Sequence, residues 1–202
     1  MAHIPDTRIS DIAAIVIGNG EGVFSEELTV GVDSQDLLPD EKIWINSEEF
    51  PTEQSDQWRT APRSGEGLEG AIRGALQSSS SSWLLFLQPG QPMDPGMLAR
   101  LNQIMVSSSA KVGCYFFDVR DGDQDLGATA SAAALLSRWQ QRFHGSNACP
   151  PVAVLRDLLE AMLADGRLRP ESDLAELPGL SSPFGWASVA VPEGLGDRHP
   201  WR

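Results

Sequence analysis

Amide side chains stand just beyond the ends of three short apolar runs of this sequence. These side chains are those of Asn19, Asn46, Gln88 and Gln91. Each amide offers both donors and an acceptor of hydrogen bonds and carries no charge. The chemistry that such a set predicts is recognition of a polar, uncharged part of a ligand by hydrogen bonding.

Motifs for zinc binding and for nucleophilic hydrolysis are missing from the sequence. His3, His144 and His199 have no Cys or carboxylate neighbour at the spacing of zinc ligands. No Gly-x-Ser-x-Gly segment occurs either. Cys114 and Cys149 are far from CxxC spacing, so we expect two reduced thiols.

The apolar runs predict the strands that would position the amides. Ile12 to Ile17 and Trp83 to Leu87 are almost wholly apolar, which is typical of strands buried on both faces. Lys42 to Ile45 predicts a shorter strand, and the polar segment Phe50 to Glu66 is interpreted as a loop. Before Trp83 to Leu87, apolar residues recur at the spacing of one helical face, at Leu68, Ala71, Ile72, Ala75 and Leu76.

The second half of the chain predicts one strand and then mainly helices. Lys111 to Val119 is the strand, and helical spacing recurs from Ala132 to Phe143 and from Val154 to Leu163. We therefore expect residues 121–176 to be a helical part. Residues 177–202 form a tail rich in Pro and Gly, with one short strand at Ala187 to Val191.

Strands that alternate with helices predict a mostly parallel sheet with helices on both faces. With 202 residues, the chain is expected to form a single three-layer α/β/α domain, residues 1–202. Ligands of such sheets bind beyond the carboxyl ends of the strands. Those ends are the residues after Ile17, Ile45 and Leu87.

The charge balance narrows the classes of partner. Lys and Arg total 15 against 28 for Asp and Glu, and the net charge of -13 argues against nucleic acid binding. No apolar run approaches the roughly 20 residues that span a bilayer. Residues Met1 to Asp11 lack the basic and apolar blocks of a signal peptide, so we expect a cytoplasmic protein without a membrane span.

The segment Gly67 to Leu101, GLEGAIRGALQSSSSSWLLFLQPGQPMDPGMLARL, resembles the central block of family 2 glycosyltransferases. A Gly-Leu-led helix, a polar break, an apolar strand and a Pro-containing turn follow in that family's order. The best match covers residues 11–120. The resemblance implies the A-type nucleotide-diphospho-sugar transferase fold, and, for an enzyme, hexosyl transfer from a nucleotide sugar.

The sequence departs from the family where acidic residues are expected. The family's Asp-x-Asp motif, which binds a divalent cation, is replaced by Gln88 to Gln91, and Asn46 stands where an Asp is usual after the second strand. Hard cations need anionic oxygen ligands, so no metal or other cofactor is expected. Asn19, Asn46, Gln88 and Gln91 would then line a neutral nucleotide pocket. Transfer without a metal would need other groups to neutralise the diphosphate, and the nearest positive residues in the sequence are Arg73, Arg59 and Arg63.

Inverting members of the family use a late carboxylate as general base. The counterpart implied here is Asp173 or Glu171 in the segment RPESDL, with Asp173 as the candidate catalytic residue. The alternative interpretation of these carboxylates is a solvated acidic turn that begins a helix.

Two hypotheses for function follow. The first is a divergent or catalytically impaired glycosyltransferase-like domain that binds a nucleotide sugar or carbohydrate. The second is a non-enzymatic module that contacts another protein from a degenerate glycosyltransferase fold. An open cleft lined by Arg and amide groups would favour the first, and a filled cleft would favour the second.

Overall fold

The computed structural model describes nine stretches of the chain: residues 11–18, 26–46, 58–89, 93, 95–107, 112–120, 131–144, 149–181 and 184–190. Their elements, in chain order, are β1 (Ile12–Ile17), α1 (Glu26–Asp33), β2 (Glu41–Asn46), β3 (Arg59–Pro62), α2 (Gly67–Ser78), β4 (Trp83–Leu87), α3 (Met97–Ser107), β5 (Cys114–Arg120), α4 (Ala132–Phe143), β6 (Val152–Leu155), α5 (Arg156–Ala164), the 3-10 helix η1 (Leu174–Glu176), α6 (Leu177–Leu180) and β7 (Phe184–Ala190).

The strands form one seven-stranded sheet in the order β3-β2-β1-β4-β6-β5-β7. β6 runs antiparallel to both of its neighbours, and every other pair is parallel. In register, Val16 of β1 lies between Trp44 of β2 and Leu87 of β4. The carboxyl ends of β1 to β4 therefore meet at one edge of the sheet, where β6 begins.

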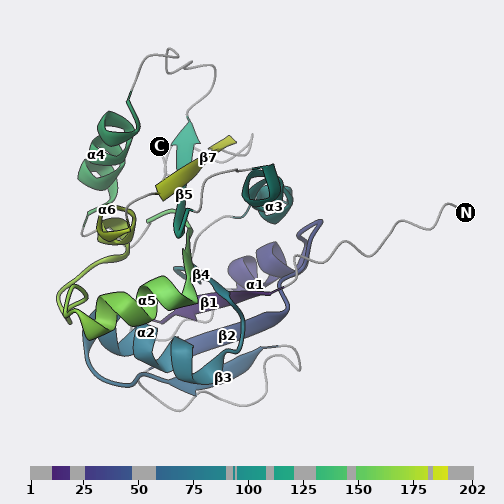
Figure 1. Ribbon diagram of the computed structural model, residues 1–202. Helices are drawn as coiled ribbons and strands as arrows, with labels where there is room; N and C mark the ends of the chain where they lie inside the picture. Colours follow the sequence, from purple (N-terminus) through teal and green to yellow (C-terminus); the bar gives the residue numbers. More distant parts are fainter. Residues whose placement is uncertain are drawn as a thin grey trace, which may run out of the picture.

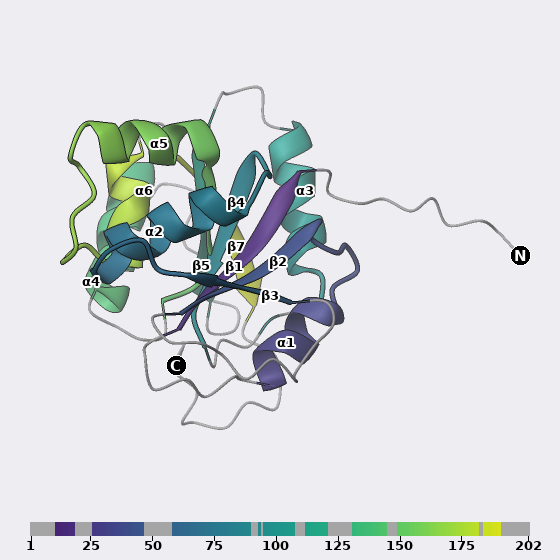
Figure 2. The ribbon, with the colours of Figure 1, turned by 90° about the horizontal axis from the view of Figure 1, so that it is seen from below.

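Helices cover both faces of this sheet. α1 and α3 lie on one side, and α2, α5 and α6 lie on the other, as the two perpendicular views agree (Figure 1, Figure 2). The three-layer α/β/α architecture predicted from the sequence is confirmed, with a sheet that is mostly parallel.

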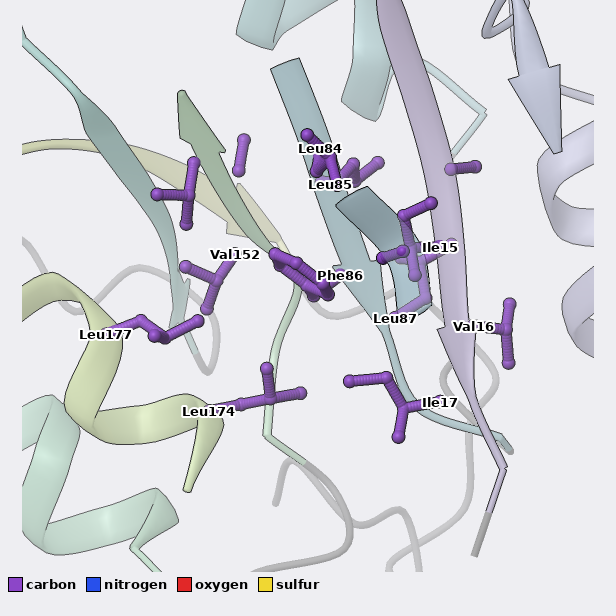
Figure 3. Close-up of a cluster of buried hydrophobic side chains, with 14 of the residues drawn as sticks. Ile15, Val16, Ile17, Leu84, Leu85, Phe86, Leu87, Val152, Leu174 and Leu177 are labelled. Atoms are coloured by element: carbon purple, nitrogen blue, oxygen red, sulfur yellow. The ribbon is translucent and has the colours of Figure 1, made fainter. Parts of the chain in front are cut away.

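The core is densest around the two central strands. All six residues of β1 are buried, as are four of the five residues of β4. Late segments of the chain complete this cluster, with Leu174 from η1 and Leu177 from α6 (Figure 3). The segment that follows α5 is thus held to the strands of the first half by apolar burial.

Two strands correct the sequence prediction. β3 lies in the segment interpreted as a loop. Its sequence does not reveal it, because this edge strand has four residues, buries only Ala61 and ends at Pro62. β6 occupies the start of the helix predicted from Val154 to Leu163, and α5 begins only at Arg156. The apolar run of the strand continues into the buried face of α5, so the change of period is hard to see. The predicted helical part 121–176 therefore contains a central strand.

At the amino edge of the sheet, the Glu41 carboxylate at the start of β2 joins β2 to β3 and to the serine segment before β4. Its Oε1 accepts hydrogen bonds from the backbone N–H of Ser80 at 2.9 Å and from the hydroxyls of Ser79, Ser80 and Ser81 at 3.3, 3.0 and 3.0 Å. Its Oε2 contacts the Arg59 guanidinium. Arg59 is thus committed to the edge opposite the one where the site was predicted.

We expect Glu41→Gln to destabilise the protein by about 1–3 kcal/mol at pH 7, because it removes charge-assisted hydrogen bonds from three serines, of which Ser79 and Ser81 are buried. Burial alone would raise the pKa of Glu41, but the hydrogen bonds from Ser80 and Ser81 and the charge of Arg59 bring it below its usual value. A lowered folded-state pKa gives stability that is present above the unfolded-state pKa and lost as the pH falls through the folded-state pKa.

Urea denaturation between pH 7 and pH 3 checks this prediction. The difference in unfolding free energy between wild type and Glu41→Gln should shrink below about pH 4. Glu171→Gln, at an exposed carboxylate 3.9 Å from Arg169, is the control and should change stability by less than about 0.5 kcal/mol. A difference that stays constant with pH would contradict the assignment.

Candidate functional site at the carboxyl edge of the sheet

Polar groups gather where β1 to β4 end. Gly18 directly follows β1, and its N–H donates to the carbonyl of Ile45 in β2 at 2.9 Å. Arg63 follows β3 and Gln88 follows β4. The sheet register thus brings the ends of three different strands to one place, as the alternation of strands and helices predicted.

Arg63 bridges two backbone segments at this edge. One of its terminal nitrogens donates to the Gly18 carbonyl after β1, and the other donates to the Gly67 carbonyl in the first turn of α2 at 3.3 Å. Its Nε is buried without a hydrogen-bond partner, and no described carboxylate lies within salt-bridge distance. Burial also lowers the pKa of the guanidinium. The described partners of Arg63 are neutral carbonyl groups, so its positive charge is available to attract an anion.

Gln88 lies at the same edge and is tied to the chain that leads into β6. Its Oε1 accepts a hydrogen bond from the backbone N–H of Cys149 at 2.8 Å. The neutral amide at this position therefore fixes the relative positions of the β4 and β6 segments. Its carbonyl oxygen is already engaged in that contact.

Asp173 lies in the second half of the sequence, between α5 and η1. Burial and the nearby Asp173 carboxylate together raise the pKa of the Cys149 thiol. The backbone N–H of Cys149 is the group that contacts Gln88. Asp173 is also the N-cap of η1, since its Oδ1 accepts from the N–H of Ala175 at 2.5 Å. The N-cap position agrees with the interpretation of this carboxylate as one that begins a helix.

The segment that carries Asp173 rests on the start of α2. The N–H of Leu68 donates to the Pro170 carbonyl at 3.3 Å. Gly67 has a φ of +56°, and a Cβ there would lie 1.8 Å from the Pro170 oxygen. Only a glycine allows so close an approach of the two backbones. Asp173 and Arg63 are thereby linked through one short stretch of α2.

The remaining predicted residues divide into two groups. Arg73 lies on α2 with an exposed side chain that pairs with Glu69 at 2.7 Å, so its charge is already balanced by a neighbour. The other predicted groups lie outside the described residues: Asn19, Gln91 and the side chain of Asn46. Arg63 is the cation that sequence reasoning did not single out from Arg59 and Arg73, because the contact with Gly18 depends on the sheet register.

The described residues do not fit a divalent cation. Among them, no group of three or more His, Cys, Asp or Glu side chains is arranged to hold a metal ion. The side-chain oxygen of Gln88 already accepts a hydrogen bond from the Cys149 N–H. Neutral amides are weak ligands for magnesium or manganese.

The fold is that of the A-type glycosyltransferases, as comparison with solved structures shows. Glucosyl-3-phosphoglycerate synthase from Mycobacterium tuberculosis, in complex with Mn²⁺, uridine diphosphate (UDP) and phosphoglyceric acid, matches 90% of this chain and 69% of its own, with a TM-score of 0.52 and 15% identity. The same synthase with UDP alone gives a TM-score of 0.52 at 15% identity, covering 90% of this chain and 71% of its own. Its complex with Mn²⁺ and UDP-glucose gives 0.50 at 16% identity, covering 90% and 70%.

Comparisons by sequence find nothing. No family model matches the chain, and no curated protein matches it. In the described part of the chain, no helix has the length and apolar character needed to cross a membrane.

Proposed function

We propose that this chain binds a nucleotide sugar at the carboxyl edge of its sheet and transfers the sugar to an acceptor hydroxyl without the Asp-x-Asp metal site. The observation that carries the proposal is the gathering of Gln88 and the Arg63 guanidinium, whose Nε is buried, at the edge where β1 to β4 end. The late carboxylate Asp173 belongs to the segment that rests on the start of α2 through the hydrogen bond between Leu68 and Pro170. A cytoplasmic location remains a prediction from the sequence.

Each polar group at this edge receives a role in the proposal. Arg63 neutralises the diphosphate of the donor, since charge-assisted hydrogen bonds from a desolvated guanidinium are strong. Asn46, with Asn19 and Gln91, recognises the nucleoside by hydrogen bonding. Asp173 acts on the acceptor side, where the proton of the acceptor hydroxyl must be removed. Transfer without a metal then relies on Arg63 to stabilise the leaving nucleoside diphosphate.

Calorimetric titration of the purified protein with UDP, GDP and their glucose and mannose conjugates tests the proposal. Each titration is run with and without Mn²⁺, and UDP release is then followed with acceptors that include phosphoglyceric acid. We expect saturable binding of one nucleotide series, with an affinity that changes less than about threefold on adding Mn²⁺.

Two results would count against the proposal. Absence of binding to every nucleotide in both conditions would remove the donor site altogether. Binding that appears only with Mn²⁺ would show that the metal-free form of the proposal is wrong and that carboxylates outside the described residues hold a cation.

One observation favours a second candidate, a module that contacts another protein. The side chains of Arg63 and Gln88 are both tied to the protein's own backbone, as they would be in a closed former donor cleft. The same titration separates the two candidates, since a closed cleft binds no nucleotide under any condition.

A further inference from the structure

His144 ends α4 at a point where two carboxylates converge. Its Nδ1 lies 3.5 Å from Asp173 Oδ2 and 3.8 Å from Glu176 Oε1. The backbone N–H of His144 donates to the Gln140 carbonyl at 2.8 Å, so the residue closes the last turn of the helix. The imidazole therefore faces η1 from a neighbouring element.

The contact between α4 and η1 is fixed by groups other than the imidazole. Gln140 Nε2 donates to the Ala175 carbonyl at 3.2 Å, and Phe143 is buried with 2% of its surface exposed. The backbone of His144 is thus anchored, whereas 64% of its side chain remains exposed. An exposed group on an anchored backbone can meet a ligand without reorganising the fold.

Asp173 is poorly placed to take a proton from an acceptor by itself. Its Oδ1 accepts from the Ala175 N–H at 2.5 Å, and its Oδ2 faces His144. Only 22% of its side chain is exposed. Both oxygens are directed towards protein groups, and the group that extends from Asp173 towards solvent is the imidazole.

We propose that His144 is the proton acceptor of the transfer reaction and that Asp173 is its positioning residue. This inference rests on the proposed function and refines the role of the carboxylate within it. Asp173 Oδ2 accepts from Nδ1–H, which leaves the lone pair of Nε2 directed away from the carboxylate. The 3.5 Å separation is at the long end for a hydrogen bond, as is common for catalytic pairs without bound substrate.

The acceptor hydroxyl oxygen forms a bond to the anomeric carbon of the donor while its proton moves to Nε2 of His144. The bond between the anomeric carbon and the diphosphate oxygen breaks, and its electron pair leaves with the nucleoside diphosphate. The imidazolium is stabilised by Asp173 and Glu176, and it then gives its proton to water.

The other charged groups around His144 do not substitute for it. Arg142, on the same last turn, stacks over the Phe143 ring with its guanidinium carbon 5.2 Å from the ring centroid. Glu176 is a second acidic neighbour from η1. The Arg142 guanidinium has only donors and cannot accept a proton, and the Glu176 carboxylate faces the imidazole at 3.8 Å, so the imidazole is the acceptor that the inference assigns in this cluster.

Kinetics of His144→Ala in the full chain, with added imidazole, test the inference. We expect kcat to fall by about a hundredfold or more while the calorimetric Kd for the donor stays within twofold of wild type. Free imidazole should restore part of kcat in a saturable manner. Because the side chain is largely exposed, the variant leaves no buried cavity for imidazole to fill as a merely structural ligand.

Two further variants sharpen the comparison. Arg142→Ala, an exposed change two residues away, is the matched control and should keep wild-type kcat. Asp173→Asn should lower kcat without loss of donor binding, and imidazole should not rescue it because His144 is still present.

Three outcomes would overturn the inference. An active wild type with an equally active His144→Ala variant removes His144 alone and leaves the proposed function standing. Loss of activity that imidazole does not rescue and that is accompanied by loss of donor binding assigns His144 a structural role. A wild type that neither binds donor nor transfers sugar overturns this inference together with the proposed function.

Discussion

Gly67→Ala is expected to destabilise the protein by about 2–5 kcal/mol, through the left-handed backbone and a backbone clash together. The φ of +56° at Gly67 is unfavourable for any residue with a Cβ, and that Cβ would lie 1.8 Å from the Pro170 carbonyl oxygen. The Pro170 carbonyl belongs to the backbone, so no side-chain rotation relieves the overlap. The segment that carries Asp173 must move away from α2 instead.

Gly166→Ala is the matched control for this prediction. Gly166 has a φ of +64°, close to that of Gly67, but nothing lies within 4 Å of its added Cβ. Gly166→Ala should destabilise the protein only through its left-handed backbone conformation, by about 1–2 kcal/mol. Urea denaturation of both variants checks the difference, and equal losses would show that the contact between Gly67 and Pro170 is not a close one in solution.

The second large effect is expected at Arg63. Arg63→Met should weaken binding of the nucleotide sugar by about 10–100-fold, because charge-assisted hydrogen bonds contribute about 1.5–3 kcal/mol. Arg63→Lys should recover only part of this loss, since an ammonium group cannot bridge Gly18 and Gly67 while also reaching a diphosphate. Calorimetric Kd values for donor and for free UDP give the measurement.

Two arginines serve as controls for charge. Arg59 begins the same strand, β3, but is held at the opposite edge by Glu41, and Arg73 pairs with Glu69 on the exposed side of α2. Arg59→Met and Arg73→Met each remove one positive charge and should leave the donor Kd within about twofold. A loss of affinity at Arg73 as large as at Arg63 would restore the original sequence prediction. Thermal unfolding of each variant separates loss of binding from loss of fold.

Much of the fold could be predicted from the sequence because burial leaves a periodic pattern. The runs that became β1 and β4 are apolar throughout, and α2 begins at Gly67 with its buried stripe at the predicted positions. β3 and β6 left no such pattern. An edge strand of four residues buries too little to be seen, and the apolar residues of β6 merge with those of α5.

The candidate site was predictable only in part. Gln88 could be placed at the carboxyl edge because its strand was recognisable, and Asp173 was a candidate only through the family resemblance. That Gln88 contacts the Cys149 backbone depends on the antiparallel insertion of β6, which the sequence did not suggest. The choice of Arg63 over Arg73 likewise depends on where the ends of β1 and β3 meet, a property of register that a single sequence does not encode in its periodicity.

Because β6 runs antiparallel to β4, substitutions and insertions on the two sides of this edge can accumulate separately in evolution. Because β6 starts at the edge where β1 to β4 finish, the two sides of the proposed site are built from segments of opposite chain polarity. The side assigned to the donor consists of residues that follow strands, whereas His144 and Cys149 precede one. A change in the length or composition of the chain ahead of β6 can therefore reshape the acceptor side while the donor side keeps its anchors. Under the proposed function, acceptor preference and donor preference are separately adjustable traits of this chain.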